Sequence, residues 1–225
     1  MTERGMIFNA EMVRALLAGR KTQTRRPIKW RQTRATEIAE REDGSKWPWS
    51  EDAENVCDYW HPCPFGAVGD RIWVRETWQV IHDYIDENGI VDERRFARSI
   101  PRQRGNYWHP VYEEHFGNES REDRGFPWRP SIHMPRWASR ITLEITDVRV
   151  ERLNSISEED ARAEGIIDGG CVNCGESEPC GCAHPQPDAT DAFAYLWQSI
   201  YGHENWNANP FVWVIQFERV EGGAA

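Results

Sequence analysis

The chain has 225 residues, of which 39% are hydrophobic, and its 37 acidic and 27 basic side chains give a formal net charge of −10. This length suffices for one substantial core, so we expect a single domain spanning residues 1–225. The negative charge argues against a protein that coats nucleic-acid backbone by bulk electrostatics. No leader pattern and no run of about 18 apolar residues occur, which predicts a cytoplasmic protein without a membrane partner.

The first part of the chain predicts a short strand, a helix and a loop insertion. Residues 6–8 are expected to form the strand, and Asn9 to cap a helix whose apolar residues recur at helical spacing. Gly19 should end that helix in a left-handed conformation. Residues 30–62 are polar, punctuated by Trp and Pro, and lack a steady period, so we expect a first insertion there.

The remaining chain alternates strand patterns with short helices. Residues 71–78 alternate as a strand, residues 79–130 lack a period and predict a second insertion, and residues 139–153 give the clearest strand pattern. Ser157 should cap a short helix that Gly165 ends. A further helix from about residue 188 to Gly202 and a last strand at 211–217 follow. Without regular βαβ alternation, these elements predict a mixed α+β fold.

Four of the six cysteines and one histidine lie in a Gly- and Pro-rich loop at residues 168–187. They are Cys171, Cys174, Cys180, Cys182 and His184. In a reducing compartment such a cluster favours metal over disulfides. Four of these five side chains, either the four thiolates or three thiolates with His184, would close a tetrahedral zinc site with a structural role, because no position stays open for water. Free thiols are the alternative, and Cys57, His61 and Cys63 form a second, weaker half-site.

A basic patch stands out in the acidic chain between residues 12 and 36, which contain no acid. Its members are Arg14, Arg20, Lys21, Arg25, Arg26, Lys29, Arg31 and Arg34. The patch could steer a nucleotide phosphate or RNA, or it could be a solvated surface that balances acidic neighbours. Of the 12 tryptophans, most should pack in the core, and one or two are expected to stack on a base.

The segment 17–26, LAGRKTQTRR, resembles the signature of the ASCH family, which belongs to the PUA-like superfamily. The signature positions are Gly19, Lys21, Thr24 and Arg26. Many ASCH domains carry glutamate in place of Thr24, whereas small bacterial amidohydrolases that deacetylate acetylcytidine are similar to this chain in having threonine. Larger ASCH proteins of phages and prophages also look similar at residues 68–78 and 135–142. The resemblance implies a small mixed β-barrel flanked by short helices, here with long loop insertions at about 30–62, 79–130 and 168–187.

In those amidohydrolases a lysine, a threonine and a later glutamate form the catalytic set, which the resemblance carries over to Lys21, Thr24 and Glu164. Amide hydrolysis needs a nucleophile, a base and a proton donor, and these three groups could supply them without a cofactor. Lys21 can act as a base only if its pKa is lowered. On a regular strand Lys21 and Thr24 would face opposite sides, so a turn or bulge must intervene.

Further substrate-binding candidates are Arg20, Arg26, Glu76 and Trp78. An acid such as Glu76 is unusual on an otherwise apolar strand face, although a core salt bridge with an arginine would also explain it. Our leading hypothesis is an amidohydrolase acting on N4-acetylcytidine or a related modified cytidine nucleoside or nucleotide. The alternatives are a non-catalytic reader of RNA or modified bases, a ribonuclease, and a phage assembly factor.

Overall fold

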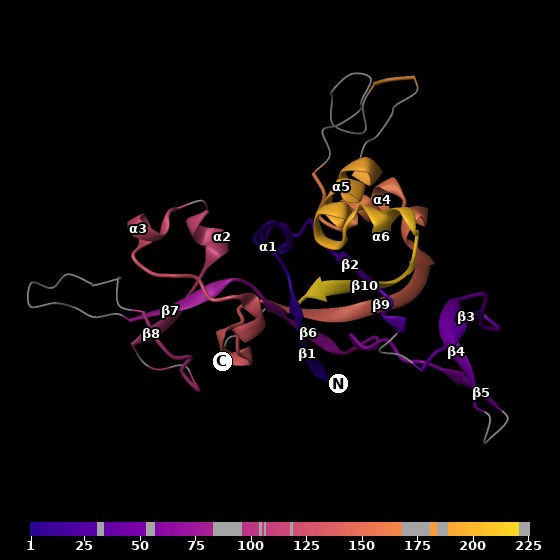
Figure 1. Ribbon diagram of the computed structural model, residues 1–225, viewed down its shortest axis with the longest axis horizontal. Coiled ribbons are helices and arrows are strands. Elements are labelled where there is room, and N and C mark those ends of the chain that lie inside the picture. Colours follow the sequence, from indigo (N-terminus) through magenta and orange to yellow (C-terminus); the bar gives the residue numbers. More distant parts are fainter. Residues whose placement is uncertain are drawn as a thin grey trace, which may run out of the picture. The chain divides into compact units, whose positions relative to one another are not determined.

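The computed structural model describes residues 1–30, 34–52, 57–82, 96–103, 105, 107–117, 119–167, 181–183 and 189–220 (Figure 1). The chain divides into two compact units. The first unit comprises Met1–Leu17, Arg71–Leu143 and Arg219–Ala225, and the second comprises Ala18–Asp70 and Glu144–Glu218. Each unit therefore combines segments that are distant in the sequence.

The first unit contains one parallel and one antiparallel strand pair. Strand β1 (Glu3–Ile7) runs parallel to β6 (Arg71–Arg75), and β7 (Trp78–His82) runs antiparallel to β8 (Trp108–Tyr112). Its helices are α1 (Ala10–Leu17), α2 (Glu113–Phe116) and α3 (Arg121–Arg124), with 3₁₀ turns at Ser131–His133 and Arg136–Ala138. A core cluster consists of Trp78, Val80, Ala97, Tyr112, Met134 and Ala138.

The second unit contains three neighbouring strands and three helices. Strands β9 (Thr142–Arg152), β10 (Phe211–Arg219) and β2 (Gln23–Pro27) lie side by side in this order, although β9 begins within the first unit. Helices α4 (Glu158–Ala163), α5 (Ala189–Tyr201) and α6 (His203–Asn207) gather on one face of these strands (Figure 1), after a 3₁₀ turn at Leu153–Ser155. A core cluster joins Leu153, Ile156, Ala161, Ala189, Phe193, Trp197, Val212 and Val214.

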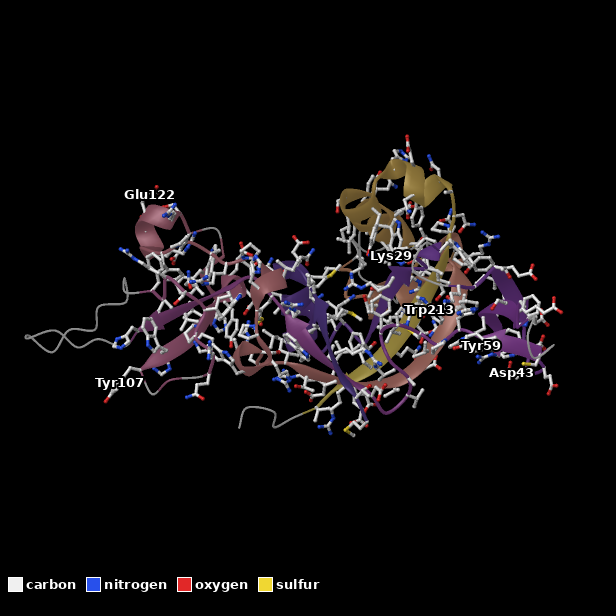
Figure 2. All side chains as sticks on the ribbon, turned by 60° about the horizontal axis from the view of Figure 1, so that its bottom comes forward. Lys29, Asp43, Tyr59, Tyr107, Glu122 and Trp213 are labelled. Atoms are coloured by element: carbon white, nitrogen blue, oxygen red, sulfur yellow. The ribbon has the colours of Figure 1, made fainter. Side chains whose placement is uncertain are left out.

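A small antiparallel sheet also belongs to the second unit. Its strands are β3 (Glu37–Glu40), β4 (Lys46–Asp52) and β5 (Cys57–Trp60). The turn between β3 and β4 contains Gly44 at a φ of 80°, and Asp43 accepts a hydrogen bond from the backbone of Ser45. The indole of Trp213, labelled in Figure 2, meets Trp47 of β4 edge to face at a centroid distance of 5.0 Å. The sheet is thus anchored by aromatic packing.

The structure confirms a mixed α+β fold and several element ends. Asn9 Oδ1 accepts from the backbone of Met12 at 2.8 Å, and Ser157 Oγ accepts from Asp160 at 3.1 Å, so both helices have the expected caps. Gly19 and Gly165 have φ angles of 71° and 91°, as expected for residues that end helices. Within the described residues the strands form open sheets and no closed barrel.

Two of the expected loop insertions contain helices and strands. Strands β3, β4 and β5 lie within residues 30–62, and β8, α2 and α3 lie within residues 79–130. These strands have four to seven residues, too short to show a period against their polar neighbours. The strand expected at 71–78 is divided between β6 and β7. The cysteine-rich segment lies outside the described residues except for 181–183.

No helix in the described part of the chain has the length and apolar character needed to cross a bilayer.

Candidate active site

The second unit brings Lys21 to the end of helix α4. After Gly19 the chain turns, and Lys21 forms an isolated antiparallel bridge with Glu164. The backbone of Thr22 donates to the carbonyl of Ala163 at 2.8 Å, and the Arg20 guanidinium donates to the carbonyl of Gly165 at 2.9 Å. These carbonyls have no partner inside the helix, because a helix leaves its last carbonyls unpaired. The helix end is therefore stabilised by the segment that carries Lys21.

Lys21 and Glu164 form a buried ion pair between residues 143 positions apart. Lys21 Nζ donates to Glu164 Oε2 at 2.7 Å and to the Glu164 carbonyl at 2.7 Å. The exposed fractions of the two side chains are 0% and 3%. Burial lowers the pKa of Lys21, and this effect outweighs the opposing attraction of Glu164, while Arg26 and Arg25 lower the pKa further. The neutral amine is therefore more accessible than in an exposed lysine.

Arg25 joins this pair to a second group of acids. Its guanidinium contacts Asp160 at 2.6 Å, Glu151 at 3.2 Å and Glu164 at 3.6 Å. Arg149 contacts Asp160 at 3.0 Å and Glu151 at 2.6 Å. Desolvation raises the pKa of Asp160, but hydrogen bonds and charge from Arg25 together with the charge of Arg149 leave that pKa below its usual value. We call these six residues the Lys21 cluster: Lys21, Arg25, Arg149, Glu151, Asp160 and Glu164.

Several buried polar atoms at the cluster have no hydrogen-bond partner among the described residues. They are Gln23 Oε1, Arg25 Nε, Arg25 Nη1 and Glu164 Oε1. Gln23 uses its other polar atom, Nε2, to donate to the carbonyl of Asp160 at 2.8 Å. Arg25 Nη1 and Glu164 Oε1 face each other as an ion pair at 3.6 Å, beyond hydrogen-bond distance, which leaves Arg25 Nε as a donor and Gln23 Oε1 as an acceptor without a hydrogen bond in the described part of the chain. Unpaired buried polar groups are costly. The arrangement suits a small polar ligand that offers both donors and acceptors.

Thr24 lies on the other face of β2. Gln23 and Arg25 both contact Asp160 near helix α4, and adjacent residues of a strand point to opposite faces. Thr24 is paired with Ile215 of β10, and Arg26 with Trp213. Thr24 is also buried, with 2% exposed. Of the three expected catalytic residues, the structure brings Lys21 and Glu164 together, whereas strand alternation separates Thr24 from its neighbours in the cluster.

Glu76 and Trp78 belong to the first unit. Glu76 receives two hydrogen bonds from Arg140, at 3.0 and 2.9 Å, and is 2% exposed. This is the core salt bridge that the sequence left open as an alternative. Burial raises the pKa of Glu76 despite the opposing effect of Arg140. Trp78 is fully buried and packs against Trp137 at a centroid distance of 5.9 Å.

The other predicted sites are the basic patch and the two cysteine-containing sites. Lys21 and Arg25 are buried, so the basic patch loses two charges from the surface, while Arg14, Arg20 and Lys29 are exposed. Of the five expected zinc ligands, only Cys182 is described, and it is partly exposed. Cys57 is exposed, Cys63 is buried, and His61 is hydrogen-bonded to Ser50. Among the described residues no group of three or more His, Cys, Asp or Glu side chains could hold a metal.

The sequence did not identify Arg25, Gln23 or Asp160 as site residues. A sequence signal for them was present. On a strand, Lys21, Gln23 and Arg25 are two residues apart and so share one face, and Asp160 precedes Glu164 by one helical turn and so shares one helix face with it. Searches of protein-family models, curated proteins and solved structures give no match to this chain. We therefore infer the function from the geometry of the Lys21 cluster.

Proposed function

We propose that the chain is an amidohydrolase that removes the acetyl group from N4-acetylcytidine or a related modified cytidine, with Lys21 and Glu164 as its catalytic pair. One observation carries this proposal: the buried 2.7 Å contact between Lys21 and Glu164, the two positions that the ASCH resemblance implies. The same resemblance leads us to propose a PUA-like fold for the sheets and short helices. A cytoplasmic location, a nucleoside or nucleotide substrate, and RNA as a further partner of the basic patch are part of this proposal.

The pair can carry both proton transfers of an amide hydrolysis. Burial lowers the pKa of Lys21, and the 2.7 Å contact gives its proton a direct path to Glu164 Oε2. The Lys21 amine takes a proton from the nucleophile as its oxygen bonds to the acetyl carbon. Glu164 gives a proton to the exocyclic nitrogen as the carbon–nitrogen bond breaks. With water as the nucleophile, cytidine and acetic acid leave and the enzyme returns as the ion pair. With Thr24 as the nucleophile, cytidine leaves first, and a water molecule then hydrolyses the acetyl-threonine to release acetic acid.

The unpaired atoms beside the catalytic pair are suited to the base. An acetylated cytosine offers acceptors at its ring nitrogen and carbonyls, which match Arg25 Nε. Its N–H donor matches Gln23 Oε1. Base recognition by hydrogen bonds to this edge is the usual strategy of proteins that act on bases. The same atoms would also serve a reader, and this is the specific observation that supports the second candidate, a non-catalytic base-binding module.

The test is acetate release from N4-acetylcytidine by the full chain. We expect Lys21→Met to lower kcat/KM by at least about 10³-fold, since it removes the base. Lys29→Met is the matched control, because Lys29 (labelled in Figure 2) is an exposed lysine and should keep activity within about twofold. If the protein binds the acetylated nucleoside but releases no acetate, it is a non-catalytic base-binding module and not an amidohydrolase.

The variant Thr24→Val tests whether Thr24 or a water molecule is the nucleophile. The resemblance includes Thr24 in the catalytic set, and its hydroxyl could be the nucleophile, whereas strand alternation places Thr24 on the other face of β2. The variant keeps the shape of the side chain but removes its hydroxyl. A loss of about 10²-fold or more would assign attack to Thr24, and activity within about threefold would assign it to a water molecule that Lys21 deprotonates.

We also propose that Cys171, Cys174, Cys180, Cys182 and His184 provide the ligands of a structural zinc ion. Thiolates and imidazole at this spacing are the support for it. Metal analysis of the full chain should then find about one zinc per chain, with loss in Cys174→Ser. Cys57→Ser is the matched control, because Cys57 is an exposed free thiol outside the proposed set.

A further inference from the structure

A serine hydroxyl and an imidazole meet on the three-stranded sheet of the second unit. Ser50 of β4 lies opposite Tyr59 of β5. His61 follows Tyr59 by two residues, and its backbone donates to the carbonyl of Pro48 at 2.9 Å, which continues the ladder beyond β5. Ser50 and His61 are therefore diagonal neighbours on one face of the sheet. Ser50 Oγ lies 2.8 Å from His61 Nε2.

The surroundings hold the imidazole in a form that can accept a proton. His61 is 9% exposed, and the Tyr59 ring packs edge to face against it at a centroid distance of 4.7 Å. Burial lowers the pKa of His61, and the charge of Arg34 lowers it further. A neutral imidazole hydrogen-bonded to a hydroxyl is the arrangement that activates a serine nucleophile.

The hydroxyl can also be approached from outside. Ser50 is partly exposed, and Tyr59, labelled in Figure 2, is 50% exposed. Arg34 is exposed and close enough to act on the charge of His61, so it adds positive charge near the pair. Positive charge favours an anionic substrate and stabilises an oxyanion. We infer that Ser50 and His61 form a second nucleophilic site, which takes the acyl group from anionic carboxylic esters.

The chemistry of this site balances with water as the only co-reactant. Ser50 Oγ bonds to the acyl carbon, and its proton passes to His61 Nε2. The bond from the acyl carbon to the alcohol oxygen breaks, and the alcohol leaves with that proton. Water then attacks the acyl-serine, His61 takes and returns one proton, and the carboxylic acid leaves. The activity differs from the proposed deacetylation and uses none of the Lys21 cluster.

An alkyl fluorophosphonate tests the nucleophile directly on the full chain. The Ser50 oxygen would displace fluoride and keep the phosphonyl group. Trypsin then releases the peptide 47–71, in which Ser50 is the single Ser or Thr. We expect the added mass on Ser50, no mass on this peptide in Ser50→Ala, and a labelling rate about 10²-fold lower in His61→Gln.

The control is Ser155→Ala, which should label at the wild-type rate. Ser155 is an exposed serine whose hydroxyl donates to the Arg152 carbonyl at 2.6 Å, without an imidazole. Absence of label on the wild-type peptide 47–71, or label on Tyr59 in place of Ser50, would overturn the proposal. An unchanged rate in a folded His61→Gln would do the same. If His61→Gln does not fold, the wild type and Ser50→Ala, which deletes one partly exposed hydroxyl, decide the result.

Discussion

Each unit contains a buried group of charges, and the two groups differ in how completely they are paired. In the first unit Arg140 contacts Glu76 at 2.9 Å, Glu114 at 3.0 Å and His115 at 2.8 Å, and it stacks over Tyr112 at 4.1 Å. We call this set the Arg140 cluster. Every nitrogen of its guanidinium makes a hydrogen bond. In the Lys21 cluster, by contrast, Arg25 Nε has no hydrogen-bond partner among the described residues, and Arg25 Nη1 faces Glu164 Oε1 at 3.6 Å, beyond hydrogen-bond distance.

The difference separates a structural ion pair from a candidate site. Four hydrogen bonds from all three guanidinium nitrogens leave Arg140 little capacity for a ligand, so stability explains the Arg140 cluster. Within the described chain, the Lys21 cluster keeps an unpaired donor, Arg25 Nε, beside a lysine with a lowered pKa. Perturbed groups with unused hydrogen-bonding capacity are typical of functional sites. For this reason we place the proposed chemistry at Lys21 and Glu164, and treat Glu76 as a residue of the core.

The largest expected effect is on stability, from removing Lys21. Lys21→Met leaves the Glu164 carboxylate buried with Arg25 at 3.6 Å, and breaking a buried pair costs about 3–5 kcal/mol. The double variant Lys21→Met with Glu164→Leu should recover most of this loss, because it removes the uncompensated charge. Urea unfolding followed by tryptophan fluorescence measures the free energies.

Arg140→Met is the matched change in the first unit. Its cost should be smaller, about 1–3 kcal/mol, because the raised pKa of Glu76 means that this carboxyl can take up a proton when its partner is lost. If Arg140→Met destabilises the protein more than Lys21→Met, the proposed contrast between the two clusters is wrong.

Much of the fold was predictable because local chemistry determines it. Asn9, Ser157, Gly19 and Gly165 end or begin helices through their own side chains or positive φ angles. The sheet β3–β4–β5 was missed although Asp43 and Gly44 form a known hairpin signal. Its strands are short and mix Trp and Pro with charges, so the period-2 pattern was obscured.

The site was predictable only in part, because contacts distant in sequence decide it. The resemblance connected Lys21 with Glu164, and the structure brings them to 2.7 Å. No sequence pattern could show that Arg25 would be buried among three acids, since that depends on β2 lying beside α4. Lys21 and Thr24 are three residues apart, which predicts opposite faces on a regular strand. The register of β2 agrees with this, because it separates Thr24 from the residues of the Lys21 cluster.

The two clusters should respond to pH with opposite signs. Asp160 has a pKa below its usual 3.8, so its contribution to stability is present above that pH and is lost as the pH falls through the lowered value. Glu76 has a pKa above its usual 4.5, so its contribution is present below that pH and is lost as the pH rises through the raised value. Asp160→Asn should therefore flatten the stability profile below about pH 4, and Glu76→Gln should flatten it above about pH 4. Unfolding measured at several pH values checks both, and profiles that change on the same side for both variants would contradict the assignment.

The smallest effects should come from two serine caps, one in each unit. Ser157 Oγ accepts from the backbone of Asp160 at 3.1 Å, and Ser120 Oγ accepts from the backbone of Asp123 at 3.2 Å, so the two caps have the same geometry. Replacing either by Ala should cost about 1 kcal/mol or less. Only Ser157 caps the helix that ends at Glu164, so Ser157→Ala should also lower acetate release several-fold, because small displacements of a catalytic group are costly. Ser120→Ala should leave turnover unchanged at equal folded fraction, and equal kinetic losses in both variants would show that the position of α4 has no special role in catalysis.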